Sequence, residues 1–215
     1  MTEKIILIGG GGHCEDIIET LRLNKIYDPI GILDLQEKIG NKILGVPIIG
    51  HDIDMEKIRQ QNVNHCFIAV GAVGKPLIRV RLYKSAKNLN FSFPNIIHPS
   101  ALLASSAIMG DGNYIGPNTV VHASVKIGNC TIINSGSIIE HHCEIGNFVH
   151  IAPGVTLSGG VVVGDKTHIG TGACSIQYVK IGENTTIGVG SVVVKHIESN
   201  VVAFGNPCRS RRNQK

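Results

Sequence analysis

The second half of the chain carries an apolar residue at every sixth position. Counting in steps of six from Ile97 to Ile187, each position is apolar except Ser175, and glycine follows eight of them. Period six fits neither an amphipathic helix, with apolar residues three or four apart, nor a half-buried strand of period two. The pattern predicts a parallel β-helix, in which short strands stack coil upon coil around an apolar interior.

The first half alternates between short buried strands and amphipathic helices. Strands are predicted at residues 5–8, 30–33 and 66–70, and helices after residue 13, at 53–61 and at 77–87. This alternation predicts a small open α/β domain of Rossmann-like type with a parallel sheet. We therefore expect an α/β domain over residues 1–95 and an all-β parallel β-helix with a C-terminal tail over residues 96–215.

Composition supports thin strands joined by tight corners. The 215 residues include 26 glycines, no tryptophan and only 4% aromatics, so small and branched aliphatic side chains must build the core. Glycine after the interior residue permits a corner that needs a positive φ.

Charge and targeting signals exclude several classes of partner. Arg209, Arg211, Arg212 and Lys215 supply four positive charges, equal to the net charge of +4, so the rest of the chain is near neutral. We expect neither nucleic acid nor membrane as a partner. The first residues hold a four-residue apolar run, and no later stretch is long enough to span a bilayer. The six cysteines form no C-x-x-C pair, so we expect reduced thiols in a cytoplasmic protein and no metal site.

A glycine-rich turn joins the first strand to the first helix. Gly9 to Gly12 and His13 place backbone N–H groups and a helix N-terminus where a phosphate could bind, and Asp34 ends the next strand, where it could accept hydrogen bonds from a ribose. The dinucleotide pattern would require glycine where Cys14 stands, so NAD is not predicted. A tight corner that binds nothing stays open as an alternative.

Titratable residues gather in one stretch of the repeat, from Asn134 to Glu144. It contains Glu140, His141 and His142. Histidine is the side chain best suited to accept a proton near neutral pH, so this stretch offers a candidate general base. Two surface histidines at a solvated turn are the alternative.

Over residues 97–207 the repeat resembles the left-handed β-helix acyltransferase superfamily. The resemblance alone implies the left-handed winding, since general chirality rules favour right-handed crossovers. It also implies a homotrimer with active sites between neighbouring β-helices.

Four further segments extend the resemblance to nearly the whole chain. They are Gly9-x-Gly11-Gly12-His13, Ile32-Leu33-Asp34, Ala69-Val70-Gly71 with Arg79, and Ile97-His98-Pro99-Ser100-Ala101. Together they are similar to the bacterial family of UDP-4-amino-sugar N-acetyltransferases and sialic-acid O-acetyltransferases. This implies acetyl-CoA as cosubstrate and a nucleotide-linked amino sugar as acceptor. The implied substrate-binding residues are Gly11, Gly12, His13, Asp34, Gly71 and Arg79.

The resemblance also implies roles in the β-helix. His141 matches the family's general base and Asn134 a residue that positions the acceptor. His150 matches a residue near the thioester, and Gly159 a backbone N–H that polarises its carbonyl. Gly172 and Asn206 would border the coenzyme channel. The residue after the base is acidic in the family but is His142 here, so either Glu140 or Glu144 substitutes, or the base works without a carboxylate.

The favoured function is acetylation of the 4-amino group of a nucleotide-linked 4-amino-4,6-dideoxy sugar in glycan biosynthesis. O-acetylation of sialic acid or a related sugar is the runner-up, because it needs the same base. A non-catalytic sugar-binding protein would leave the histidine cluster unexplained. Zinc carbonic anhydrases share the hexapeptide fold, but their metal histidines include a pair five residues apart, and no two histidines here have that spacing.

Overall fold

The computed structural model describes residues 2–71 and 76–211, and the chain divides into two compact units, Met1–Pro99 and Ser100–Lys215. Arg212 and Lys215, two of the four tail cations, lie outside the described residues. Among these residues no helix is both long and apolar enough to cross a bilayer.

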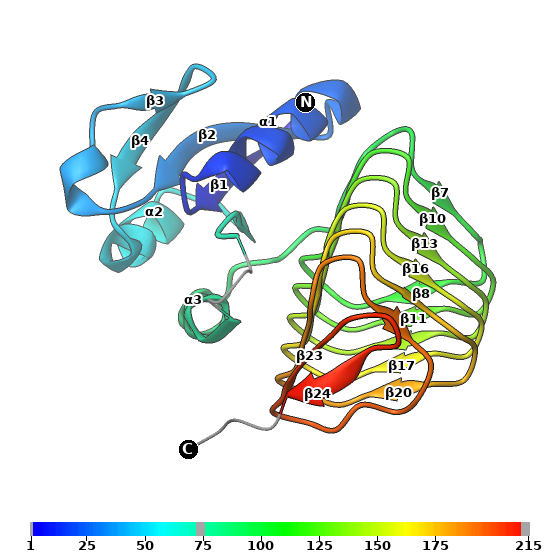
Figure 1. Cartoon of the computed structure of the whole chain (residues 1–215). Coiled ribbons are helices and arrows are strands. Elements are labelled where there is room, and N and C mark those ends of the chain that lie inside the picture. Colours follow the sequence, from blue (N-terminus) through cyan, green and yellow to red (C-terminus); the bar gives the residue numbers. More distant parts are fainter. Residues whose placement is uncertain (1, 72–75, 212–215) are drawn as a thin grey trace. The chain divides into compact units, whose positions relative to one another are not determined.

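The first unit is an α/β fold around a five-stranded sheet of order β3-β4-β2-β1-β5 (Figure 1). Strands β4, β2, β1 and β5 are parallel, and β3 pairs antiparallel with β4. The strands are β1 (Glu3–Ile8), β2 (Tyr27–Leu33), β3 (Lys42–Ile43), β4 (Val46–Gly50) and β5 (His65–Ile68), and β6 (Ile96–Ile97) precedes the end of the unit.

Two 13-residue helices follow the first and last strands of the parallel core. They are α1 (Gly12–Asn24) and α3 (Pro76–Asn88), with the short η1 (Gln36–Lys38), η2 (Asp52–Asp54) and α2 (Met55–Gln60) between them. Ile17, Ile18 and Leu21 of α1 are buried, as the amphipathic pattern predicts. The helix predicted at 53–61 forms, but its first turn is the separate 3-10 element η2.

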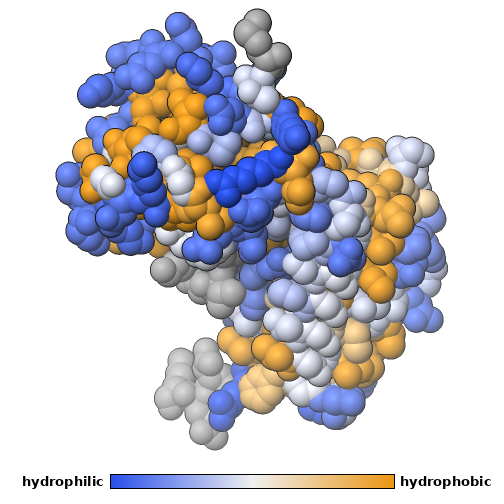
Figure 2. Space-filling model, turned by 90° about the horizontal axis from the view of Figure 1, so that it is seen from above, coloured by the Kyte–Doolittle hydropathy of each residue, from blue (hydrophilic) through white to orange (hydrophobic). Residues whose placement is uncertain are grey.

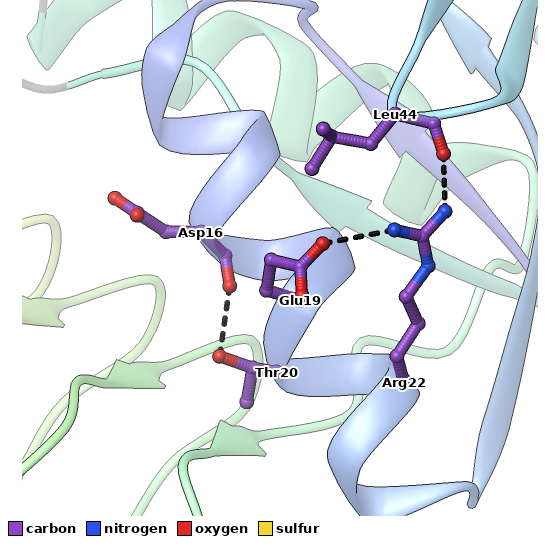
Figure 3. Close-up of polar contacts among 5 residues, drawn as sticks. All are labelled: Asp16, Glu19, Thr20, Arg22 and Leu44. Carbon is purple, nitrogen blue, oxygen red and sulfur yellow. Dashed lines mark hydrogen bonds and ion pairs between the residues drawn. The ribbon is translucent and has the colours of Figure 1, made fainter.

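The β3–β4 hairpin was not predicted, and β5 ends two residues earlier than expected. Leu44 (φ 45°) and Gly45 (φ 84°) make the hairpin turn, and a leucine at positive φ gives none of the usual Asn-Gly signal. Arg22 of α1 donates hydrogen bonds to Leu44 O and to Glu19, 2.8 Å away, so the turn is fixed to the helix (Figure 3). The sheet is therefore mixed at this edge.

The second unit is a left-handed β-helix of three stacked parallel faces (Figure 1). Face 1 contains β7 (Leu102–Leu103), β10 (Val120–Val121), β13 (Ile138–Ile139), β16 (Thr156–Leu157), β19 (Cys174–Ser175) and β22 (Val192–Val193). Face 2 contains β8 (Ile108–Met109), β11 (Lys126–Ile127), β14 (Glu144–Ile145), β17 (Val162–Val163) and β20 (Lys180–Ile181). Face 3 contains β9 (Tyr114–Ile115), β12 (Ile132–Ile133), β15 (His150–Ile151), β18 (His168–Ile169), β21 (Thr186–Ile187), β23 (Val202–Phe204) and the antiparallel β24 (Arg209–Arg211).

The hexapeptide register predicted from sequence is confirmed. The sixth-position residue is the second residue of each two-residue strand, and from Ile115 to Val193 it is buried on all three faces. Strands pair with partners 18 residues away, as with Val120 and Ile138, so one coil takes three hexapeptides. The first residue of each strand points away from the interior, but Tyr114, Ile132 and His150 on face 3 are nevertheless buried.

The edges of the β-helix differ in how their backbone N–H groups are hydrogen-bonded. At the edge between faces 2 and 3, side-chain oxygens of Asn129, Asn147 and Asp165 accept backbone N–H groups of the preceding coil at 2.8–2.9 Å. The edge between faces 1 and 2 lacks such an amide ladder among the described residues. Figure 2 shows that apolar side chains also reach the surface in patches. Leu102 and Val189 are among the exposed apolar residues of the β-helix.

Candidate active site

His141 lies on the edge between faces 1 and 2, in the turn from β13 to β14. We call the corner column of Ala123, His141, Gly159 and Gln177 the histidine edge. The imidazole of His141 rests on Gly159 in the next coil: a Cβ built on Gly159 would lie 2.6 Å from His141 Cε1 and 2.8 Å from Nε2. Glycine at 159 is therefore required for the ring to lie where it does.

Gly159 is buried, and its backbone N–H is the second polar group at this corner. Within the described residues it donates no hydrogen bond to the protein, whereas the next amide, Gly160 N, donates to His141 O at 2.8 Å. The equivalent amides on the Asn129–Asp165 edge are occupied by side-chain oxygens. The structure thus places a ring nitrogen and an unused N–H donor side by side, the pair that acyl transfer to an amine needs.

His141 is hydrogen-bonded to His142. The two Nδ1 atoms are 3.0 Å apart, and the ring planes meet at 84°. His142 has a φ of 60°, a left-handed conformation that this corner also has at Ser124, Gly160 and Tyr178 in the other coils. Both side chains are exposed.

The two candidate carboxylates are engaged elsewhere. Glu140 Oε1 lies 3.6 Å from His122 Nε2, and Glu144 Oε1 lies 2.9 Å from Lys126 Nζ. Within the described chain, neither carboxylate is hydrogen-bonded to His141. Within one protomer, the described part of the chain therefore gives His141 no hydrogen-bonded carboxylate.

Cys143 follows the two histidines but points into the interior. Its Sγ is hydrogen-bonded to Ser158 O at 3.2 Å, and burial raises the pKa of its thiol to about 11. A thiol with this pKa supplies little thiolate near neutral pH, so it is poorly suited to be a nucleophile.

The other β-helix residues predicted for the site lie apart from His141 within one chain. Asn134 and Gly172 are on the edge between faces 3 and 1, where Asn134 Oδ1 accepts from Ser135 N at 3.1 Å. His150 is the outward residue of β15 on face 3, opposite the histidine edge. Asn206 is in the exposed turn between β23 and β24. A single protomer therefore brings together only Glu140, His141, His142 and Gly159.

Two contacts near these residues were not predicted. The ring of His168 is tilted over that of His150, with the Nδ1 atoms 3.0 Å apart, and burial lowers the pKa of His168. The exposed ring of Tyr178 packs on Gly160, one coil beyond the histidines. The residues of each pair are 18 positions apart, so a coil length of three hexapeptides would have predicted that they lie in neighbouring coils.

In the α/β unit, Asp34 fastens the glycine-rich turn. Its Oδ2 accepts hydrogen bonds from Gly10 N at 3.0 Å and from Lys38 Nζ at 2.9 Å, and its Oδ1 accepts one from Leu35 N at 2.8 Å. Burial by itself would raise the pKa of Asp34, but the hydrogen bonds from Lys38, Leu35 and Gly10 hold it below its ordinary value. The Asp34 carboxylate is thus already hydrogen-bonded to groups of its own chain.

The loops after β1 and β5 meet at the same edge of the sheet. A Cβ on Gly9, whose φ is 105°, would lie 2.8 Å from Val70 N. The buried Arg79 of α3 donates hydrogen bonds to Ile68 O, 3.1 Å away, and to Val70 O. Gly71 is exposed just beyond them. Arg79 therefore supports the loop from beneath.

Gly11 caps α1, and its position and that of Gly12 have open space around them. His13 follows in the first turn of α1 and is half-buried. Gly11, Gly12, His13, Asp34 and Gly71 thus surround the carboxyl ends of parallel strands, where open α/β sheets bind ligands.

The described residues contain no group of three or more His, Cys, Asp or Glu side chains arranged to hold a metal ion.

Comparisons with known proteins agree with both halves of the chain. Residues 4–86 match the PglD N-terminal domain, and residues 106–141 and 124–159 match the bacterial transferase hexapeptide model of six repeats. A comparison with curated proteins gives no match.

Solved structures resemble the whole chain. PerB from Caulobacter crescentus, solved in complex with CoA and GDP-perosamine, is 34% identical over 99% of both chains, with a TM-score of 0.92. The acetyltransferase domain of PglB from Neisseria gonorrhoeae, in complex with acetyl coenzyme A, is 32% identical over 98% of this chain and 100% of that one, with a TM-score of 0.89. WeeI from Acinetobacter baumannii, 23% identical over 98% of this chain and all of its own, shares the fold with a TM-score of 0.85.

The sequence identity to PerB and to the PglB acetyltransferase domain exceeds 30% over nearly the whole chain. The PglD-type N-terminal domain and the hexapeptide repeats are both present in this chain. The chain belongs to the family of acetyl-CoA-dependent hexapeptide-repeat acetyltransferases that carry a PglD-type N-terminal domain.

Proposed function

We propose that this enzyme transfers the acetyl group of acetyl-CoA to the 4-amino group of a nucleotide-linked 4-amino-4,6-dideoxy sugar in bacterial glycan biosynthesis. The observation that carries the proposal is the position of the His141 imidazole against Gly159, whose N–H is unused. The likeness to PerB, crystallised with CoA and GDP-perosamine, supports an amino sugar as acceptor.

The proposed chemistry uses one base and one oxyanion donor. The unprotonated amine attacks the thioester carbon while His141 Nε2 accepts its proton. The N–H of Gly159 stabilises the negative charge that develops on the carbonyl oxygen. Collapse of the tetrahedral intermediate breaks the C–S bond, and the imidazolium returns the proton to the departing thiolate. The products are the acetamido sugar and CoA.

The α/β unit is proposed to bind the nucleotide part of the acceptor. The N–H groups of Gly11 and Gly12 at the start of α1 suit a diphosphate. Asp34 and Arg79 shape this site from behind, since their side chains bind Gly10 N and the Val70 carbonyl. His13 and Gly71 are proposed to line it.

The active site is proposed to form between protomers of a homotrimer. Asn134 and Gly172 lie on one edge of face 1 and His141 on the other. A three-fold packing that buries face 1 would bring the Asn134 edge of one protomer to the His141 edge of the next. The outward column of face 1 supports this packing because it has no charge: its residues are Leu102, Val120, Ile138, Thr156, Cys174 and Val192.

In that arrangement His150, Gly172 and Asn206 are proposed to border the acetyl-CoA, with Asn134 positioning the acceptor. The cytoplasm is the proposed location, because all six cysteines are free thiols, as a reducing compartment favours.

The test measures CoA thiol release from acetyl-CoA with a panel of acceptors. We expect release with a UDP- or GDP-linked 4-amino-4,6-dideoxy sugar and none with free sialic acid. His141→Asn replaces the base with a polar side chain that cannot accept the proton. It should lower kcat by about 10²–10⁴-fold with acetyl-CoA binding retained. The matched control is His122→Asn, one coil away, which should keep wild-type turnover.

Two results would contradict the proposal. Release with sialic acid but with no amino sugar would assign O-acetylation instead. Wild-type turnover in His141→Asn would remove His141 as the base.

A further inference from the structure

The contact between His141 and His142 limits the positions of their ring protons to two arrangements. A neutral imidazole carries one N–H, and the two Nδ1 atoms are 3.0 Å apart. One ring must therefore donate at Nδ1 and the other must accept there. The two possible arrangements have opposite consequences for catalysis.

Only one arrangement leaves His141 able to act as a base. If His141 donates its Nδ1–H to His142, then His141 Nε2 keeps a lone pair for the substrate proton. If His142 donates instead, His141 carries its hydrogen on Nε2 and cannot accept one there. The hydrogen bond made by one ring nitrogen decides the state of the other.

We propose that His142 is a positioning residue: a neutral imidazole that accepts the Nδ1–H of His141 and so does the work usually given to a carboxylate. The inference rests on the proposed function, and it specifies what supports the base at that site. His142 acts through His141 and requires no contact with the substrate.

The surroundings make His142 the available acceptor. Glu140 faces His122, and Glu144 on β14 faces Lys126 on β11. The neighbouring corner residues, Ala123 and Ser124 in the coil before and Gly159 and Gly160 in the coil after, carry no charge. Nearby Cys143 has a buried, protonated thiol, and the Tyr178 ring packs on Gly160. The imidazolium formed at His141 is thus stabilised by a neutral ring, and no carboxylate of the described residues is hydrogen-bonded to it.

This arrangement predicts a distinctive response to pH. When the pair takes up a proton, either His141 loses its free nitrogen or His142 loses its acceptor, so activity falls on the acid side. An aspartate at 142 would stay an acceptor and would stabilise the imidazolium by its negative charge. It would therefore hold the proton on His141 up to a higher pH.

Three variants test the proposal, all suited to the left-handed backbone at 142, where φ is 60°. His142→Gly removes the acceptor, His142→Asn keeps one that does not titrate, and His142→Asp supplies a charged one. Ser124→Gly, at the same corner position one coil earlier and also with a φ of 60°, controls for the effect of glycine on the corner.

We expect His142→Gly to lower kcat about 10–100-fold with the KM for acetyl-CoA unchanged. His142→Asn should restore most of that loss. His142→Asp should move the acid limb of the kcat/KM profile up by about one pH unit or more. Ser124→Gly should match the wild type. Wild-type kcat in His142→Gly, or an unmoved acid limb in His142→Asp, would overturn the proposal.

A spectroscopic measurement separates this inference from the proposed function. Imidazole ¹⁵N shifts of the wild-type protein near neutral pH should show His141 protonated at Nδ1 and His142 at Nε2. The reverse assignment would refute the role of His142 even if the enzyme acetylates the expected sugar. The expected assignment would stand even if the true acceptor were a different molecule.

Discussion

The residues on the histidine edge owe their positions to small neighbours. His141 lies on Gly159 and Tyr178 lies on Gly160, so two adjacent glycines carry two aromatic rings from the coils on either side. A side chain at 159 would displace the imidazole, because its Cβ would come within 2.6 Å of the ring. The site therefore depends on the lack of a side chain at Gly159 and Gly160 as much as on the histidines.

A residue-scale prediction concerns Cys143, which lies beside the histidines in sequence. Burial raises its pKa to about 11, so an acetyl-enzyme intermediate on this thiol is not expected. Cys143→Ala should keep kcat close to that of the wild type, and iodoacetamide at neutral pH should leave activity unchanged. Steady-state kinetics of the variant and the alkylated enzyme check this. A burst of CoA release without acceptor, lost in Cys143→Ala, would show covalent catalysis instead.

At the scale of elements, strand ends and turns are fastened to one another by side chains. Asp34 at the end of β2 binds the turn between β1 and α1, and Arg79 of α3 binds the end of β5. The first contact joins the ends of β1 and β2, and the second fixes α3 to the end of β5. In the β-helix, coil-to-coil backbone hydrogen bonds perform the same task, and the Asn129–Asp165 side chains add to them at one edge.

Replacement of Asp34 should affect the acceptor and spare the coenzyme. Asp34→Asn removes the charge that holds Lys38 and weakens the acceptor of Gly10 N–H. The KM for the nucleotide sugar should rise by about tenfold, from loss of about 1–2 kcal/mol of charge-assisted hydrogen bonding, with the KM for acetyl-CoA unchanged. The exposed Asp28, at the start of the same strand, gives the control variant Asp28→Asn. Equal effects of both substitutions would contradict the special role of Asp34.

The lowered pKa of Asp34 also makes stability depend on pH. Because the folded pKa lies below the unfolded value, the contribution is fully present above the unfolded pKa of about 3.9 and is lost as pH falls through the folded pKa. Urea unfolding at pH 7 and below pH 4 should therefore show a larger acid destabilisation in the wild type than in Asp34→Asn. An identical acid loss in both proteins would exclude this linkage.

At the scale of the whole molecule, the β-helix presents faces of different character. The outward column of face 1 is uncharged, whereas that of face 2 includes Lys126, Glu144 and Lys180. Burial of an uncharged face costs no desolvation of ions, so face 1 is the better surface for self-association.

Ile138→Glu on face 1 should dissociate the proposed trimer, because it would bury a charge with no partner. Light scattering should give three times the 23.0 kDa chain mass for the wild type and a smaller assembly for the variant. Acetyl transfer should fall with the assembly, since Asn134 and His141 lie on different edges of one chain. The matched variant Val162→Glu, at the same strand position on face 2, should stay trimeric and active. A monomeric wild-type enzyme with full activity would exclude a shared site.

The sequence by itself determined the β-helix, because a fixed period of six residues places one apolar side chain of each strand in a common interior; the left-handed winding came from the family resemblance. It also determined the α/β order and the glycine-rich turn. It placed His141 at a corner beside Glu140 and His142. It did not determine the β3–β4 hairpin, where Leu44 occupies an unusual backbone conformation, nor the contact of His168 with His150, which joins different coils.

Only the tertiary structure decided the partner of each side chain. The sequence left three alternatives for the support of the base: Glu140, Glu144, both within three residues of it, or no carboxylate at all. The fold directs Glu140 to His122 and Glu144 to Lys126, each one coil away, and leaves His142 beside His141. The pairing of polar side chains depends on distances between coils, and the sequence pattern does not contain these distances. Burial follows the six-residue period, which the sequence pattern does contain.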